Sequence, residues 1–240
     1  MSGTLTNGGS DPVVRQCLDG LRDADPRKRA AALTLLTTLG EPARTALPAL
    51  RDTLEDASPV VRSLALGVLR EIAPEPRVLV PCLIKALQDE DEGVRRRAAA
   101  MLAALGPEAR PASAALAQAL QDKSASVRRS AAASLGEIGP TAAGGVSGLI
   151  EALREGDIRD RSIVLAALVK LGKRAQPRLL DALRHPDPTV RRYAARALGK
   201  APEGRELAAS LVLLLRDPDP AVREDARAVL RQTDPSISFR

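Results

Sequence analysis

The sequence predicts an all-α fold, a solenoid in which about six to seven two-helix repeats stack as a right-handed superhelix. A pattern that starts at Asp56 as "DASPVVRSLALGVL" returns at Asp122 as "DKSASVRRSAAASL" and at Asp217 as "DPDPAVREDARAVL". The arginines of this pattern recur at steps of 30 to 33 residues, and self-similarity at such a period is typical of stacked supersecondary units. No stretch alternates as a strand does, and aromatic residues make up only 1% of the chain.

Each repeat is expected to contain two helices, called A and B here. Helix A follows an Asp or Ser placed four residues before the arginine, where its side chain can accept a free N–H at the helix start. Apolar residues then recur at helical spacing, as Val61, Leu64 and Val68 do in the second repeat. A glycine such as Gly106 or Gly139 ends helix A, and helix B follows after a short turn.

The repeats predict one continuous array over residues 11–233, with tails at 1–10 and 234–240. The array starts with a half-repeat cap at 11–22, continues with six helix pairs at 23–217 and ends with one A-type helix at 218–233. The first residues lack the basic start and apolar stretch of a secretory signal, and no apolar run reaches the length of about 18 residues that spans a bilayer. We therefore expect a cytoplasmic protein that does not associate with a membrane. Its two cysteines, Cys17 and Cys82, are too few for a disulfide framework and are expected to be buried thiols.

At the level of motifs the chain resembles HEAT repeats, specifically the short HEAT-like repeats of phycobilisome (bilin) lyase subunits. The frame "D-x-D/S-P-x-V-R-x-x-A-A-x-x-L-G-x-I-G-P" carries this resemblance, as in "DKSASVRRSAAASLGEIGP" from Asp122, together with B helices of the type "LPALRDTLED". The resemblance covers about residues 11–233. It implies a solenoid whose B helices line a concave face, in a family that mostly serves as binding scaffold.

A second column of residues lies six positions before each arginine and holds five Asp, one Glu and one His. In a stacked array, these residues and the arginines are expected to line the loops between repeats and to form a ladder of ion pairs and backbone hydrogen bonds. The expected ladder consists of Asp23, Arg29, Asp56, Arg62, Asp89, Arg95, Asp122, Arg128, Glu155, Arg161, His185, Arg191, Asp217 and Arg223.

The composition argues against catalysis. His185 is the only histidine, so a two-histidine metal site cannot be built, and the glycines of "AAGGV" at 142–146 lack the Gly-Lys-Ser/Thr ending of a phosphate-binding loop. The sequence therefore predicts a protein that is not an enzyme and has no cofactor or metal. For His185 two interpretations stay open: a neutral ring that accepts a hydrogen bond or faces solvent, and a pH-sensitive rung whose protonated ring repels Arg191.

The charge distribution favours an anionic partner for the second half of the chain. Residues 123–240 hold 21 Lys and Arg against 14 Asp and Glu, whereas residues 1–122 hold 15 against 16. Helical spacing places Arg154, Lys173, Arg184, Arg205 and Arg216 on the exposed side of the late B helices. With Arg174 and Arg178 of the same basic stretch, these are the predicted partner-binding cations.

From these cations we expect a scaffold or adaptor that binds a protein or acidic peptide on the concave face. A nucleic-acid backbone is the first alternative, although the scarcity of aromatic residues argues against stacking on bases. An accessory subunit of a bilin-lyase-like enzyme is the second alternative, and a solvated face without a partner also stays open.

Overall fold

The computed structural model describes residues 11–201 and 204–233, apart from the side chains of residues 204–206 and 208. These residues form fourteen α-helices and five short 3-10 segments, and no strand occurs among them. The expected tails at 1–10 and 234–240 lie outside the described residues. The chain divides into two compact units, residues 1–98 and 99–240, and the division falls within helix α6 (Glu92–Leu105). Each unit is described by itself.

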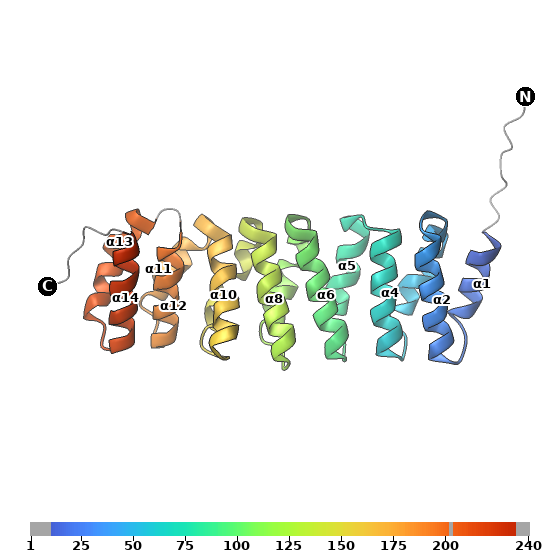
Figure 1. Ribbon diagram of the computed structural model, residues 1–240, viewed down its shortest axis with the longest axis horizontal. Coiled ribbons are helices and arrows are strands. Elements are labelled where there is room, and N and C mark those ends of the chain that lie inside the picture. Colours follow the sequence, from blue (N-terminus) through green and yellow to red (C-terminus); the bar gives the residue numbers. More distant parts are fainter. Residues whose placement is uncertain (1–10, 202–203, 234–240) are drawn as a thin grey trace, which may run out of the picture. The chain divides into compact units, whose positions relative to one another are not determined.

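Unit 1 begins with a lone helix and continues with two A–B pairs. Its helices are α1 (Pro12–Gly20), α2 (Pro26–Leu39), α3 (Leu47–Thr53), α4 (Pro59–Ile72) and α5 (Pro76–Ala86), with the 3-10 segment η1 (Glu41–Ala46) before α3. The A helices α2 and α4 pack against each other, α1 packs on α2, and the B helices α3 and α5 pack on α4 (Figure 1). Leucines fill the space between them, and Leu33, Leu36, Leu50 and Leu66 are fully buried.

Unit 2 holds the second half of α6 and eight further α-helices. They are α7 (Ser113–Ala119), α8 (Ala125–Ile138), α9 (Val146–Ala152), α10 (Ile158–Leu171), α11 (Gln176–Ala182), α12 (Pro188–Gly199), α13 (Gly204–Val212) and α14 (Pro220–Thr233). The 3-10 segments are η2 (Gly106–Ala112), η3 (Gly139–Gly145), η4 (Gly172–Arg174) and η5 (Leu213–Arg216).

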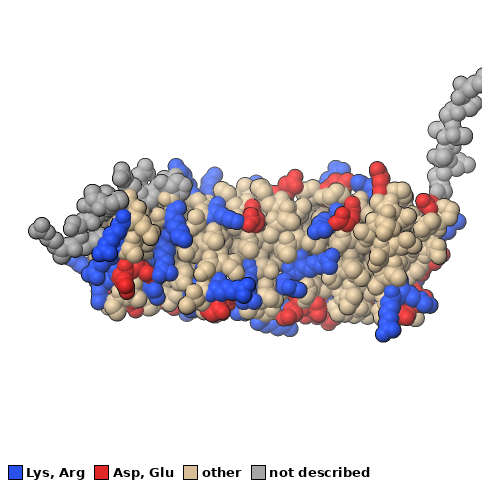
Figure 2. All heavy atoms as spheres, viewed as in Figure 1, with Lys and Arg blue, Asp and Glu red and all other residues tan. Residues whose placement is uncertain are grey.

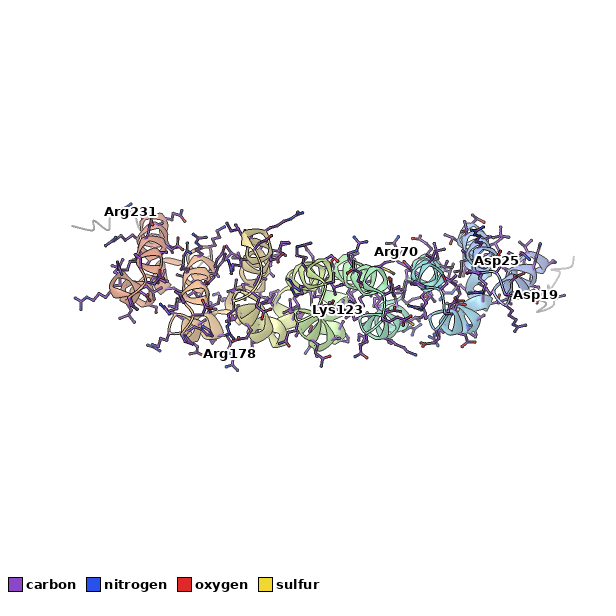
Figure 3. The ribbon with its side chains drawn as sticks, turned by 90° about the horizontal axis from the view of Figure 1, so that it is seen from below. Asp19, Asp25, Arg70, Lys123, Arg178 and Arg231 are labelled. Carbon is purple, nitrogen blue, oxygen red and sulfur yellow. The ribbon has the colours of Figure 1, made fainter. Side chains whose placement is uncertain are left out.

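Within unit 2 the helices form two layers. The A helices α8, α10, α12 and α14 contact one another in sequence order, and the B helices α7, α9 and α11 do the same (Figures 1 and 3). Small side chains allow close packing in the A layer: a Cβ atom added at Gly136 of α8 would lie 3.0 Å from Cα of Ala167 in α10. The scarcity of aromatic residues agrees with this packing, because closely spaced helices leave little volume to fill.

The ends of the A helices follow the expected chemistry with one exception. Gly40, Gly106 and Gly139 adopt the positive φ angles predicted at the helix ends, between 56° and 70°. At the helix starts, Asp25 and other Asp residues accept a backbone N–H from the first turn. The serines that precede α4 and α8 hold the N-cap position without accepting such a hydrogen bond, so that detail of the prediction was wrong.

Within the described part of the chain, no helix combines the length and the apolar character needed to cross a membrane.

Candidate binding surface

Bidentate ion pairs join the acid column to the arginine column. In unit 1, Nε and Nη2 of Arg29 donate to the carboxylate of Asp56 at 2.6 and 2.7 Å, and those of Arg62 donate to Asp89 at 2.7 and 2.6 Å. In unit 2, Arg191 donates to Asp217 at 2.7 and 2.8 Å. Their side chains are between 5% and 14% exposed, so these pairs lie inside the loop layer rather than on the surface.

A second set of hydrogen bonds ties each arginine to its own loop. Nη1 of Arg62 donates to the carbonyl oxygens of Asp56 and Ala57, and the other arginines of the column, except Arg161, do the same with the two equivalent carbonyls. The acid in turn accepts the backbone N–H two residues later, as Asp89 does from Asp91 at 2.8 Å. One arginine thus connects the loop of its own repeat to the loop of the next.

These contacts favour the ionised carboxylates. Burial on its own raises the pKa of Asp89, but the hydrogen bonds from Arg62 and from the backbone N–H of Asp91 outweigh it and leave the pKa below its ordinary value. The pKa of Asp56 is lowered by the same balance, with Arg29 as its partner. For Asp217 the hydrogen bond from Arg191 is the main cause of a lowered pKa.

Not every ladder residue has its expected ion pair among the described residues. Asp23, at the start of the column, pairs instead with Lys28 at 3.0 Å. Arg128 bonds only its own loop carbonyls, and the exposed Glu155 accepts nothing from it. Arg161 donates Nε to the carbonyl of Leu153 at 2.9 Å rather than to His185.

The remaining ladder residues keep the contacts of their own loops. Nη1 of Arg95 donates to the carbonyls of Asp89 and Glu90, and Asp122 accepts the N–H of Ser124 at 2.8 Å. Nη1 of Arg223, at the end of the column, donates to the carbonyls of Asp217 and Pro218 at 2.7 and 3.0 Å.

The backbone of the loop between α9 and α10 explains why Glu155 forms no ion pair with Arg128 among the described residues. Gly156 adopts a φ of +84°, and the N-cap residue Asp157 has a ψ of −176°, whereas the N-caps of α2, α4, α8 and α12 have ψ between 117° and 123°. The backbone therefore leaves the turn in a different direction. Glu155 also carries one methylene more than Asp, and its carboxylate accepts no backbone N–H two residues later.

His185 makes one of the two contacts that an aspartate makes at this position, the backbone hydrogen bond, but not the ion pair with the preceding arginine of the column. Its Nδ1 atom accepts the backbone N–H of Asp187 at 3.0 Å, in the same turn that the aspartates make elsewhere. Its Nε2 atom lies 3.7 Å from a carboxylate oxygen of Glu151. Arg191 contacts the carbonyl oxygen of His185 and not the ring. The geometry therefore fits the interpretation in which an unprotonated Nδ1 accepts a hydrogen bond.

The predicted partner-binding cations are exposed where their side chains are described. Arg174, Arg178, Arg184 and Arg216 form no ion pair within the described residues, and we call these four the basic B surface. Figure 3 shows Arg178 on the outer side of the row of B helices.

The other three predicted cations differ from this group. Arg154 is also exposed but pairs with Glu151 at 3.2 Å. Lys173 is exposed in η4 and has an interaction of its own, and the side chain of Arg205 lies outside the described residues.

Many cations of the A helices in unit 2 are, in contrast, engaged in ion pairs. Asp225 of α14 accepts from Arg192 at 2.6 Å and from Arg196 at 2.7 Å. Arg129 of α8 pairs with Asp160 of α10 at 2.9 Å. Figure 2 shows Lys and Arg side chains over α10 to α14 on the face that the A helices present. A large part of this positive charge therefore serves contacts between helices.

An apolar cavity adjoins the basic B surface. It has a volume of about 250 Å³ and lies between α11 and the segment α13–η5, where Leu180, Leu183, Leu213 and Leu214 line it together with Ser210 and Arg184. Leu213 is 67% exposed and its neighbour Val212 is 47% exposed. Helical spacing predicts Arg184 and Arg216 on this side of the B helices, but the cavity depends on how two B helices pack and is not encoded in that spacing.

A larger cavity of about 440 Å³ lies in unit 1 between the ends of α3 and α5. An exposed ion pair between Glu55 and Lys85 belongs to its lining, and Cys82 lies in its wall. Cys17 is buried as predicted, but Cys82 is only partly buried, so that prediction was wrong for Cys82. Burial raises the pKa of the Cys82 thiol, which therefore favours the protonated form.

Among the described residues, no group of three or more His, Cys, Asp and Glu side chains lies together as metal ligands would.

Comparisons with known proteins agree with the two-helix repeats. A family model described as HEAT repeats matches residues 14–81, 80–144 and 146–231. A comparison with curated proteins finds no match.

Among solved structures, a mutant of Kap121p superposes with a TM-score of 0.73 at 16% identity, covering 94% of this chain and 29% of its own. Importin beta gives 0.64 at 13% identity and covers 92% and 36%, and an engineered protein gives 0.55 at 22% identity and covers 92% and 68%. The chain thus spans about a third of the length of Kap121p and of importin beta, and at these identities the likeness shows the fold alone.

Proposed function

The chain belongs to the HEAT-repeat family, and from that premise we propose that it is a non-catalytic scaffold or adaptor that binds acidic protein segments on the basic B surface of unit 2. The all-α repeat solenoid is a fold typical of protein-binding scaffolds. The proposed surface corresponds to the concave face that the sequence resemblance implies. The observation that supports the proposal most is the lack of ion pairs at Arg174, Arg178, Arg184 and Arg216 among the described residues, next to A helices whose cations are often paired.

Helix stability does not account for all of these cations. Arg184 follows the end of α11 and Arg216 is the last residue of η5, and positive charge is favourable at the C-terminal end of a helix. Arg174, however, precedes the start of α11, where the helix dipole disfavours a cation. An exposed cation in an unfavourable place, without an ion pair among the described residues, fits a surface that gains its counter-charge from a partner.

Protein partners fit the surface better than nucleic acid. Tyr193, the one aromatic residue within the described part of the chain, is 6% exposed, and the guanidinium of Arg196 lies 5.2 Å from the centre of its ring. It therefore offers no face for a base to stack on. Kap121p has been solved bound to the extreme C-terminus of the protein phosphatase Cdc14p, so a solenoid of this fold can hold a protein segment.

Binding of labelled probes tests the proposal. The triple variant Arg174→Glu, Arg178→Glu and Arg184→Glu is compared with Arg159→Glu, Lys200→Glu and Arg227→Glu, which changes the net charge equally at exposed sites outside the B helices. The probes are a labelled glutamate-rich peptide and a labelled DNA duplex, measured by fluorescence anisotropy at two salt concentrations, and circular dichroism checks that both variants fold.

We expect the basic-B variant to lose at least about tenfold in affinity for the peptide, because each lost exposed contact is worth up to about 1 kcal/mol, while the control loses less than about threefold. Equal losses in both variants would show that only net charge matters and would overturn the proposal. Tighter, strongly salt-dependent binding of the duplex would favour the nucleic-acid alternative instead.

An accessory role in a bilin-lyase-like enzyme and a cytoplasmic location both stay predictions from the sequence. Neither conflicts with a binding surface on unit 2.

A further inference from the structure

The apolar cavity between α11 and η5 contains a residue that breaks the pattern of the B helices. Equivalent positions near the end of the six B segments hold a polar or charged residue in five repeats and a leucine in the last. These positions are Asp52, Lys85, Gln118, Glu151, Asp181 and Leu213. Leu213 is 67% exposed, although an exposed leucine gains nothing from burial in the fold. Together with Val212, it forms an exposed apolar spot at a position where the other repeats have a polar or charged residue.

The cavity has the size and lining of a pocket for one side chain. Its volume of about 250 Å³ falls below the range of about 300–1,000 Å³ typical of pockets for whole small molecules. Four leucines form its walls, and the polar groups in its lining are Ser210 and the guanidinium of Arg184.

The charge around the pocket indicates which partner carries that side chain. Arg184 lines the cavity, and Arg216 lies three residues after Leu213 on the same 3-10 segment. Arg174 and Arg178 extend the positive charge along α11, against the single exposed acid Asp181. A second copy of the chain would bring this positive surface against its own like charges, which disfavours self-association here.

We propose that this cavity is an anchor pocket for one large aliphatic side chain, such as leucine, of an acidic peptide segment whose flanking carboxylates pair with Arg184 and Arg216. The inference rests on the proposed function, because the same basic B surface supplies the counter-charge. It adds a sequence requirement for the partner peptide, which needs an aliphatic residue between its acidic residues. The pocket thereby turns a charge-driven contact into one that selects a position along the peptide.

Two labelled peptides and two matched variants test this. One peptide has a central leucine with acidic residues on both sides, and the other replaces that leucine with serine. The variants are Leu213→Ser at the pocket and Gln118→Ser, which makes a similar change at the equivalent exposed position of α7. Because Leu213 is exposed, its replacement is compatible with folding, and circular dichroism verifies this.

We expect the native chain to bind the leucine peptide at least about tenfold more tightly than the serine peptide, as burial of one aliphatic side chain predicts. Leu213→Ser should abolish that preference while leaving the affinity for the serine peptide unchanged, and Gln118→Ser should keep the preference. Equal binding of both peptides that still depends on Arg174, Arg178 and Arg184 would overturn the anchor pocket and leave the proposed function standing.

Binding of neither peptide would overturn both proposals. A concentration-dependent dimer that Leu213→Ser dissociates, seen by sedimentation, would assign the pocket to a second copy of the chain and would overturn the anchor proposal as well.

Discussion

Arg62 and Asp89 show what one ladder pair contributes. Both side chains are about nine-tenths buried, and together they form two charge-assisted hydrogen bonds, while Arg62 also holds two carbonyls of its own loop. Removing one charge of such a pair leaves the other buried without compensation. The Asp89 carboxylate therefore stabilises the junction between two repeats more than an exposed ion pair of the same residues would.

We predict that Asp89→Asn lowers the free energy of unfolding by about 2–3 kcal/mol, because the amide keeps the turn acceptor but loses the charge opposite Arg62. Asp52→Asn, at an exposed position of α3, should change it by less than about 0.5 kcal/mol. Urea unfolding followed by circular dichroism measures both. Equal midpoints for the two variants would contradict a stabilising ladder.

The loss of stability caused by Asp89→Asn should depend on pH. The pKa of Asp89 is lowered in the folded chain, so its stabilisation is fully present above the unfolded value of about 3.9 and is lost as the pH falls through the lower folded value. The difference in stability between the native chain and Asp89→Asn should therefore be constant from about pH 5 to 7 and shrink below about pH 4. A stability difference between the two proteins that grows towards acid pH would contradict a lowered pKa of Asp89 in the folded chain.

At the scale of elements, the loop between α9 and α10 is the place where the ladder pattern fails. Arg128 keeps Nη1 on its own loop carbonyls as Arg62 does, but it forms no ion pair with Glu155 among the described residues. The positive φ of Gly156 sets the turn, and a Cβ atom there would lie 2.6 Å from a carboxylate oxygen of Asp160.

We predict that Gly156→Ala destabilises the chain by about 1 kcal/mol, because alanine disfavours a positive φ. Adding Glu155→Asp to that variant should recover most of the loss, since the loop can then adopt the turn of the other repeats and present a carboxylate to Arg128. Thermal unfolding of the single and double variants measures this. A double variant no more stable than Gly156→Ala would show that the missing ion pair has another cause.

Sequence reasoning predicted the elements well because their signals are local. The capping residues, the glycines with positive φ and the helical spacing of apolar residues each act within one or two turns, and the glycine prediction at Gly40, Gly106 and Gly139 is confirmed. The 3-10 segments before several B helices were not predicted, since they depend on how the turn packs under the next helix. Likewise, whether Arg161 bonds a carbonyl or His185 is decided by the path of a loop, which a column of aligned residues does not encode.

The candidate site was predictable only in part for the same reason. Helical spacing identified Arg184 as an exposed cation, because exposure follows from the position on a single helix, and the predicted partner-binding residues Arg174 and Arg178 are exposed as well. It did not reveal the cavity beside Leu213, which needs two B helices at a given separation. The one available signal was the leucine in a column of polar residues, and it indicates an unusual position without giving the shape around it.

At the scale of the whole molecule, different surfaces have different roles. Acid–arginine pairs in the loops and ion pairs between A helices hold repeats together, whereas the basic B surface with its apolar pocket is the surface that we propose for a partner. A repeat array suits this division, because each repeat contacts only its neighbours and the exposed residues of each can vary independently.

Hydrogen–deuterium exchange of the full chain, with and without the acidic leucine peptide, tests this division most directly. The account predicts that slower exchange on binding is confined to residues 172–184 and 210–216, around α11 and η5. Protection that falls instead on the A helices α12 and α14, or on unit 1, would contradict the assignment of the binding surface.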